Sequence, residues 1–243
     1  MTDQRYLADS SIRQFEATVE RVFDDGRVVL DGTHFYPTGG GQPADTGTIT
    51  HENDCWRVTD VHKRETIHHE LATDTAPDLE PGTTVVGELD WDRRYGHMRY
   101  HTAQHLLSAH LLEAYDAPTT GNQLYADRAR LDCEHGRFGE TAQADIEAAI
   151  NDLIEADLPV RWYELERTEA EARLDLERTR IDLLPDHITD IRIVEIGEED
   201  EPLDRVACAG THVESTGELG RLEIEGRETG GAGRERLRFQ LRE

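Results

Sequence analysis

The stretch "RYHTAQHLLSAHL", residues 99–111, contains two histidines, His101 and His105, in a segment whose apolar spacing predicts a helix. Positions four residues apart lie on one face of a helix, one turn from each other. The next position in this register is Ala109, so the pair is a local feature and not part of a polar stripe. Because the chain has 12 histidines in 243 residues, such a pair can also arise by chance. Thr102 follows the first histidine where zinc metalloproteases need glutamate, which excludes that class.

The segment before this helix is rich in predicted strands. Asp25-Gly26 is a hairpin signal between two strand-like runs, at 15–23 and 27–36. Four further short strands are expected at 46–50, 55–62, 66–71 and 83–90. Short strands at such close spacing favour a small barrel.

The pattern changes to helices mixed with strands from residue 91 onward. Residues 93–115 fit one helix, and further helices are predicted over 141–157 and 168–178. Strands are expected at 159–165, 190–196, 203–208, 219–225 and 234–241. The predicted fold class is α+β, with a small β-barrel-like domain at 1–90 and a domain of antiparallel sheet plus helices at 91–243.

The charge balance is strongly acidic. Asp and Glu number 52 against 26 Lys and Arg, a formal net charge of −26, and Lys63 is the only lysine. The acidic residues are spread along the chain, and the apolar periodicity argues against an acidic disordered protein. A folded, acidic and lysine-poor chain is typical of a high-salt cytoplasm, where net charge keeps it soluble. The negative total does not exclude RNA binding, because strong salt weakens phosphate contacts in any case.

Other features of composition indicate the compartment. The sequence has no run of about 18 apolar residues, so no membrane span and no membrane partner are expected. The first residues, "MTDQRYLADSSIRQFE", lack the apolar core of a signal peptide. Three cysteines that lie far apart do not make a disulfide framework. These features favour the cytosol.

A second pair of metal-ligating residues stands far downstream, in "CAGTHVESTGELG", which begins at Cys208. One thiolate, Cys208, and three imidazoles, His101, His105 and His212, make a plausible tetrahedral zinc set. Gly210 allows the chain to bend between the two downstream ligands. On the residues alone, chance spacing remains an equal alternative to a metal site.

The two pairs together resemble the editing domain of alanyl-tRNA synthetases and the free-standing AlaX-type alanyl-tRNA editing proteins. "TTGNQLYADRARLDC", "DIEAAINDLI" and the closing "VACAGTHVESTGELGRLEIEGRETGGAGRERLRF" are similar to family segments, so the resemblance covers about residues 91–243. "FYPTGGGQPADTG", residues 35–47, resembles the glycine-rich signature of the medium-length AlaX form. No class II aminoacylation domain fits before residue 91, so we expect a protein that does not charge tRNA itself.

The resemblance implies a zinc-dependent deacylase that acts in trans. Its expected substrate is tRNA(Ala) mischarged with serine, with glycine as a possible second amino acid, and the reaction is hydrolysis of the aminoacyl ester. The zinc ligands implied are His101, His105, Cys208 and His212. A small pocket cannot strongly reject an amino acid of similar size, so a second hydrolytic site is needed.

Several pocket residues follow from the same resemblance. Gln104 stands where relatives often have Thr, and the alternative is a surface glutamine. Asn122 is the better candidate for sensing the serine hydroxyl, with a turn-forming Asn after Gly121 as the alternative. Gly210 and Thr211 are expected to supply hydrogen bonds near the ester, although Thr211 fits a structural loop equally well.

Two further segments are candidates for substrate binding. Exposed amides of Gly39, Gly40 and Gly41, followed by Gln42, can cradle a phosphate, but a tight loop between barrel strands fits as well. Arg236 lies between Arg234 and Arg238 in a strand-like run whose alternate residues share a face, and all three can reach RNA phosphates. The alternative for this run is a solvated edge strand.

Two other functions stay open at this point. A non-catalytic tRNA-binding module with structural zinc would keep the same four ligands. An editing enzyme for another tRNA, of the threonyl type, shares the fold family, although the form of the Cys208 motif and the "GGGQP" stretch favour alanine-type editing.

The charge balance predicts that the fold depends on salt. Transfer from concentrated salt to dilute buffer removes the screening between carboxylates, so the chain should lose its folded structure. Far-UV circular dichroism during stepwise dilution measures this change. A stable, monodisperse chain in dilute buffer would contradict the high-salt inference.

Overall fold

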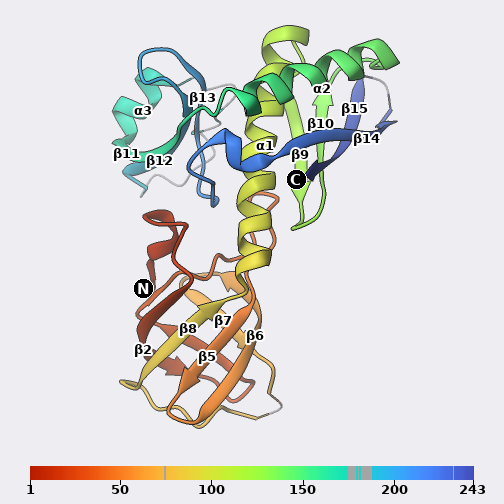
Figure 1. The fold of residues 1–243 in the computed structure, drawn as a ribbon. Coiled ribbons are helices and arrows are strands. Elements are labelled where there is room, and N and C mark those ends of the chain that lie inside the picture. Colours follow the sequence, from red (N-terminus) through yellow and green to blue (C-terminus); the bar gives the residue numbers. More distant parts are fainter. Residues whose placement is uncertain (74, 175–178, 180, 182–187, 232) are drawn as a thin grey trace. The chain divides into compact units, whose positions relative to one another are not determined.

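The computed structural model describes residues 1–73, 75–174, 179, 181, 188–231 and 233–243 (Figure 1). The described chain divides into two compact units, Met1–Met98 and Arg99–Glu243. Helix α1 spans Trp91–Tyr115, so the division falls inside this helix, after the boundary at 90/91 that the sequence predicts. Among the described residues, no helix is both long and apolar enough to cross a bilayer.

The first unit is built around a closed barrel, which confirms the predicted barrel-like fold. All its neighbouring strands pair antiparallel, in the order β2-β3-β7-β6-β5-β8. The strands are β2 (Gln14–Val22), β3 (Arg27–Leu30), β5 (Gly47–His51), β6 (Asp54–Lys63), β7 (Ile67–Leu71) and β8 (Thr84–Leu89). Alternate residues of β2, Phe15, Ala17 and Val19, are buried in the barrel core. A short parallel pair, β1 (Asp3–Gln4) and β4 (Gly32–Thr33), with the 3-10 helix η1 (Arg5–Leu7) between them in sequence, completes the unit.

The strand predicted over 27–36 is shorter in the structure. β3 ends at Leu30, because the Asp31 carboxylate accepts hydrogen bonds from the backbone N–H groups of Thr18 and Gly32, both at 2.8 Å. Residues 34–36 are buried but leave the barrel ladder and lead into the glycine-rich stretch.

The second unit contains a four-stranded antiparallel sheet in the order β14-β15-β10-β9. Its strands are β9 (Thr119–Leu124), β10 (Ala129–Glu134), β14 (Arg221–Thr229) and β15 (Arg234–Arg242). No strand is predicted from the sequence over 119–134, although "ARLDCE" alternates buried and half-buried residues along β10. β15 lies between two neighbours, so the alternative of a solvated edge strand there is wrong.

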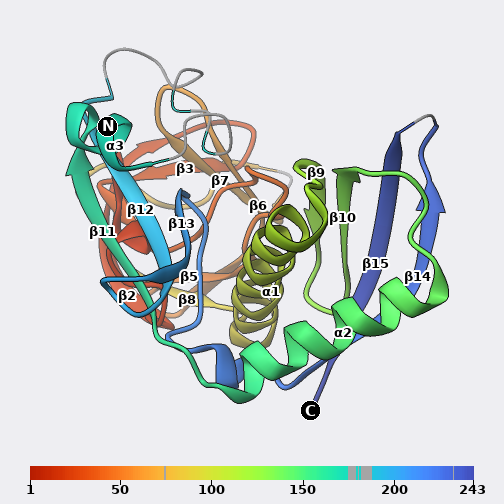
Figure 2. The same cartoon turned by 90° about the horizontal axis from the view of Figure 1, so that it is seen from above.

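Helix α2 (Glu140–Glu155) packs against this sheet. In both views it runs crosswise to β10 and β15 (Figures 1 and 2). Ile146, Ile150 and Ile154 form its buried face, as their spacing predicts. The Asn151 side chain donates to the carbonyl of Leu222 at 2.9 Å and accepts from its N–H at 2.8 Å, so it pairs with β14 as a neighbouring strand would.

A second, three-stranded antiparallel sheet has the order β11-β12-β13, with strands β11 (Val160–Glu166), β12 (Asp190–Gly197) and β13 (Pro202–Ala207). Helix α3 (Arg167–Arg173) packs on it, and Ala170, Ile191 and Ile193 share one small core. The helix predicted over 168–178 ends earlier, and its residues 175–178 lie outside the described part of the chain. The 3-10 helix η3 (Thr216–Leu219) precedes β14.

The barrel depends on a close approach at Gly47. A β-carbon at this position would lie 2.0 Å from the backbone oxygen of Glu88 and 2.8 Å from the ring of Phe35. We therefore expect Gly47→Ala to lower the free energy of unfolding by about 1–3 kcal/mol through overpacking. Thermal unfolding should show a Tm lower by about 3–10 °C for a chain of this size.

Gly136→Ala serves as the control, because a β-carbon there meets no atom within 4 Å. Equal melting temperatures of the two variants would show that β5 and β8 can separate without cost.

Candidate metal centre

The upstream pair of histidines lies on α1, which is buried on most of its sides. Leu106, Leu107 and Leu111 are fully buried around it, and His101 is 5% exposed. This burial fixes the helix, so His101 and His105 present their rings from consecutive turns, with ring centroids 5.3 Å apart.

The downstream pair lies in the loop between β13 and η3. Gly210, Thr211 and His212 in this loop are buried, and Cys208 is half-buried. The Gly210 N–H donates to Cys208 Sγ at 3.4 Å, so the loop backbone turns back on the thiol.

The four side chains meet in one cluster. Ligand atoms of His101, His105, Cys208 and His212 all lie within 4.8 Å of one another. Cys208 Sγ lies 3.5 Å from Nε2 of His101 and 3.4 Å from Nε2 of His212. Three imidazoles and one thiol at such distances can hold a metal ion.

Hydrogen bonds from outside the cluster orient two of the rings. His105 Nδ1 donates to Oδ2 of Asp204 at 2.8 Å, and Asp204 is itself buried on β13. Thr102 Oγ1 lies within hydrogen-bond distance, 3.1 Å, of Nδ1 of His212. Since the Nδ1 atoms have these partners, Nε2 is left as the ligand atom of each ring.

The electrostatics of the cluster favour a thiolate. Burial acts to raise the pKa of Cys208, but the nearby His101 and His212 rings outweigh it and hold that pKa well below its usual value. Burial lowers the pKa of His212. Burial also acts to lower the pKa of His105, yet its hydrogen bonds to Asp204 and Cys208 raise it to about 10. An ion that binds to His105 therefore displaces a proton from the ring.

Two predicted pocket residues, Gln104 on α1 and Asn122 on β9, both lie beside strand β10. Gln104 is 3% exposed and its Nε2 donates to the carbonyl of Arg130 at 3.2 Å, so it is not a surface glutamine. Asn122 is half-buried in β9, opposite Leu131, so the alternative of a turn residue is wrong. Arg130 and Leu131 are neighbours on β10, which brings both side chains to the same part of the sheet.

Arg236 on β15 lies on the other face of the four-stranded sheet from Asn122. Its guanidinium donates from Nε and Nη2 to the two carboxylate oxygens of Asp132, at 2.6 and 2.8 Å. Arg130 adds a third hydrogen bond to Asp132 at 2.9 Å. Arg236 is thus a half-exposed, ion-paired side chain.

The glycine-rich stretch belongs to the other compact unit, Met1–Met98, and forms a tight turn. Gly39 and Gln42 exchange two backbone hydrogen bonds, at 3.1 and 2.9 Å. Gly40 and Gly41 between them have φ of +57° and +84°, the signs of a type I′ turn, which other residues adopt poorly. A β-carbon on Gly40 would meet no atom within 4 Å, so the tip of the turn is open.

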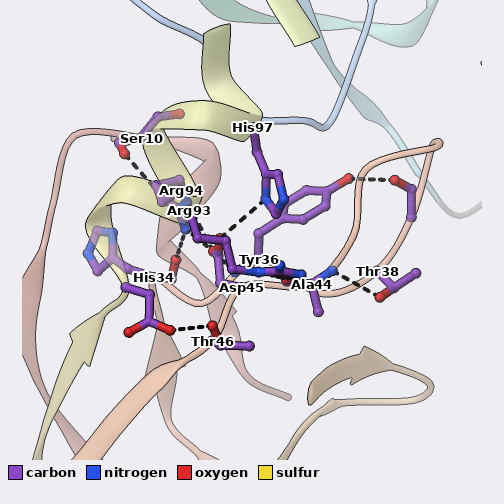
Figure 3. A network of polar contacts seen from close by, with 12 residues as sticks. Ser10, His34, Tyr36, Thr38, Ala44, Asp45, Thr46, Arg93, Arg94 and His97 are labelled. Carbon is purple, nitrogen blue, oxygen red and sulfur yellow. Dashed lines mark hydrogen bonds and ion pairs between the residues drawn. The ribbon is translucent and has the colours of Figure 1, made fainter. Parts of the chain in front are cut away.

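A buried ion pair holds the segment that follows this turn. Asp45 Oδ2 accepts hydrogen bonds from the Tyr36 N–H at 2.7 Å and from Nε of Arg94 at 3.0 Å, and neither charged side chain is more than 1% exposed. Figure 3 shows Arg93, Arg94 and His97 from the first turns of α1 converging on this segment. Arg93 donates twice to the carbonyl of Ala44, at 3.1 and 3.0 Å. These contacts make the base of the turn rigid.

Sequence reasoning missed two supporting residues, Asp204 and Thr102. Thr102 lies between the upstream histidines, so its position was a usable signal. Asp204 is 99 residues from His105 in sequence, and no local pattern distinguishes it from the other acidic residues.

Comparisons with known proteins find similarity to the same group of tRNA-related proteins along the whole chain. The family model described as tRNA synthetases class II (A) matches residues 5–93, and that of the threonyl and alanyl tRNA synthetase second additional domain matches residues 191–238. The alanyl-tRNA editing protein AlaX-M of Methanosarcina barkeri is 40% identical over 245 residues, 99% of each chain. That of Methanosarcina acetivorans is 39% identical over 247 residues, again 99% of each. The alanine–tRNA ligase of Pyrobaculum calidifontis is 37% identical over 233 residues, 92% of this chain and 25% of the ligase.

The hydrogen bond from His105 predicts a role for Asp204 in metal affinity. We expect Asp204→Asn to weaken metal binding about 10- to 100-fold, because the neutral amide no longer stabilises and orients the ring. Competition with a chromogenic chelator measures the affinity. Asp190→Asn, at an exposed position where β12 begins, is the control, and equal affinities of the two variants would exclude this role for Asp204.

Proposed function

The chain belongs to the alanyl-tRNA editing proteins of the AlaX-M type, and from this we propose that it hydrolyses the ester between tRNA(Ala) and a wrongly attached amino acid. It acts in trans, on tRNA that has already been charged. The observation that carries the proposal is the cluster of His101, His105, Cys208 and His212, in a chain that matches its relatives over 99% of its length.

The metal we propose is zinc. With bonds of about 2.3 Å to sulfur and about 2.0–2.1 Å to nitrogen, a tetrahedral zinc ion separates its sulfur and nitrogen ligands by about 3.5 Å. The distances of 3.5 and 3.4 Å from Cys208 Sγ to Nε2 of His101 and of His212 support this choice. Bound zinc supplies Lewis acidity to an ester carbonyl or to water. All three cysteines of the chain are free, which supports the cytoplasm as the compartment.

We propose serine as the chief amino acid removed, with glycine second. Gln104 supports this because its Oε1 is buried and has no hydrogen-bond partner among the described residues. This oxygen can accept a hydrogen bond from the serine hydroxyl, and alanine would leave it without one. Asn122 on β9, the better candidate from the sequence, remains a candidate for this contact beside Gln104. We take Gln104 and Thr211 as the candidate catalytic residues, and Gly210 as a residue that binds the ester through its backbone.

We propose that the glycine-rich turn and Arg236 contact the tRNA part of the substrate. The open tip of the turn at Gly39, Gly40 and Gly41, with Gln42, supports a role in holding the substrate through backbone amides. The half-exposed guanidinium of Arg236 supports a contact with an RNA phosphate.

A deacylation assay in high-salt buffer tests the proposal. The substrates are tRNA(Ala) charged with serine, glycine or alanine, and we expect fast release of serine with alanine spared. His105→Ala should abolish zinc retention and deacylation together, because it removes one of the four ligands.

His110→Ala is the matched control, since this histidine lies on the same helix but outside the cluster. Full activity of a zinc-free His105→Ala variant would exclude a metal-dependent reaction. No release from any charged tRNA(Ala), with zinc bound and the chain folded, would favour a tRNA-binding module, and release from a mischarged tRNA(Thr) would favour threonyl-type editing.

A further inference from the structure

The loop between Cys208 and His212 is held by a buried arginine, Arg192, on the central strand β12. Arg192 Nη1 donates to the carbonyl oxygen of Cys208 at 2.7 Å and to that of Gly210 at 3.1 Å. The backbone carbonyl of Arg192 accepts from the Cys208 N–H at 3.1 Å. Two hydrogen bonds thus join this residue to the ligand Cys208, and one joins it to Gly210, between the two ligands.

The guanidinium also lies over an aromatic ring. Cζ of Arg192 lies 5.4 Å from the centroid of the Trp162 ring. Trp162 on β11 is directly opposite Val194, so its side chain lies on the same face of the sheet as Arg192. A planar guanidinium held by a ring and two carbonyls has a fixed direction, which the flexible point charge of lysine does not reproduce.

The same face of this sheet contacts the other side of the cluster. Asp204 on β13 is opposite Ile196, in the same alternation as Arg192, and its carboxylate accepts from His105. One sheet face therefore meets both halves of the cluster: His105 on α1 through Asp204, and the Cys208 loop through Arg192.

We propose that Arg192 is a positioning residue of the metal centre. By fixing the carbonyls of Cys208 and Gly210, it sets the spacing at which Cys208 Sγ and His212 Nε2 meet an ion. The Gly210 N–H donates to Cys208 Sγ, so the carbonyl that Arg192 holds belongs to the residue that orients the sulfur. The inference rests on the metal-binding part of the proposed function and not on deacylation.

The test is a titration of the metal-free full-length chain with Co²⁺, which reports its ligand geometry in its d–d and thiolate charge-transfer absorption. We expect Arg192→Lys to bind Co²⁺ about 10- to 100-fold more weakly, the range for residues that orient ligands. Its charge-transfer band should weaken and its d–d bands should shift, because the sulfur no longer has one fixed position.

Arg161→Lys is the matched control. Arg161 lies on the neighbouring strand β11, on the opposite face of the sheet, and donates to the carbonyl of Gly197 and to Glu195, each at 2.8 Å. It should lose stability without any change in the Co²⁺ spectrum or affinity. An unchanged spectrum and affinity in Arg192→Lys, or equal losses in both variants, would overturn the proposal.

Trp162→Leu covers the case in which Arg192→Lys does not fold. It removes the ring and leaves both hydrogen bonds, so we expect a few-fold weaker Co²⁺ affinity with a shifted spectrum, and wild-type values would overturn the proposal. Because every readout is metal binding, an absence of deacylation by the wild-type chain would count against the proposed function and leave this test intact.

Discussion

Four donor atoms from two distant parts of the sequence must meet within 4.8 Å, a space smaller than the pitch of one helical turn. The buried helix α1 supplies two of them from consecutive turns, and a loop supplies the other two. Neither part can hold this geometry alone, because imidazole rings rotate about their side-chain bonds and the backbone of a loop can shift. The hydrogen bond from His105 to Asp204 restrains the ring of the helix pair, and those from Arg192 restrain the loop.

The three-stranded sheet serves two physical roles on its two faces. One face carries the small apolar core beneath α3, together with Glu195, which accepts from Arg161, Arg205 and Tyr163. The other face carries Asp204 and Arg192, whose hydrogen bonds end on the metal cluster. Strand β12 is buried on both faces, so it has little freedom to shift. Because the apolar core beneath α3 holds β12 in place on one face, the side chain of Arg192 on the other face has a fixed position.

Local patterns predicted much of this molecule. The spacing of apolar residues predicted α1, α2 and most strands, and the barrel is confirmed, because these elements depend on periodicity within a short window. β9 was missed because "TTGNQL" offers almost no apolar alternation. The two ligand pairs were visible from spacing, but Asp204 was not, since its partner lies 99 residues away. The alternative of a surface glutamine at Gln104 is wrong because its burial depends on β10, 26 residues away in sequence. The alternative of a turn at Asn122 is wrong because it lies in β9, which was not predicted.

The boundary between the two compact units falls within a helix and not within a loop. A fragment that began at Arg99 would start its helix two residues before His101, where backbone N–H groups lack partners and helix ends fray. The stretch similar to the Pyrobaculum calidifontis ligase spans 92% of this chain, so the similarity extends across this boundary. Recombination that moved the cluster into a new gene would therefore keep it ordered only by carrying the preceding residues along. Residues 91–98 of α1 therefore support the cluster, although they belong to the compact unit of the barrel.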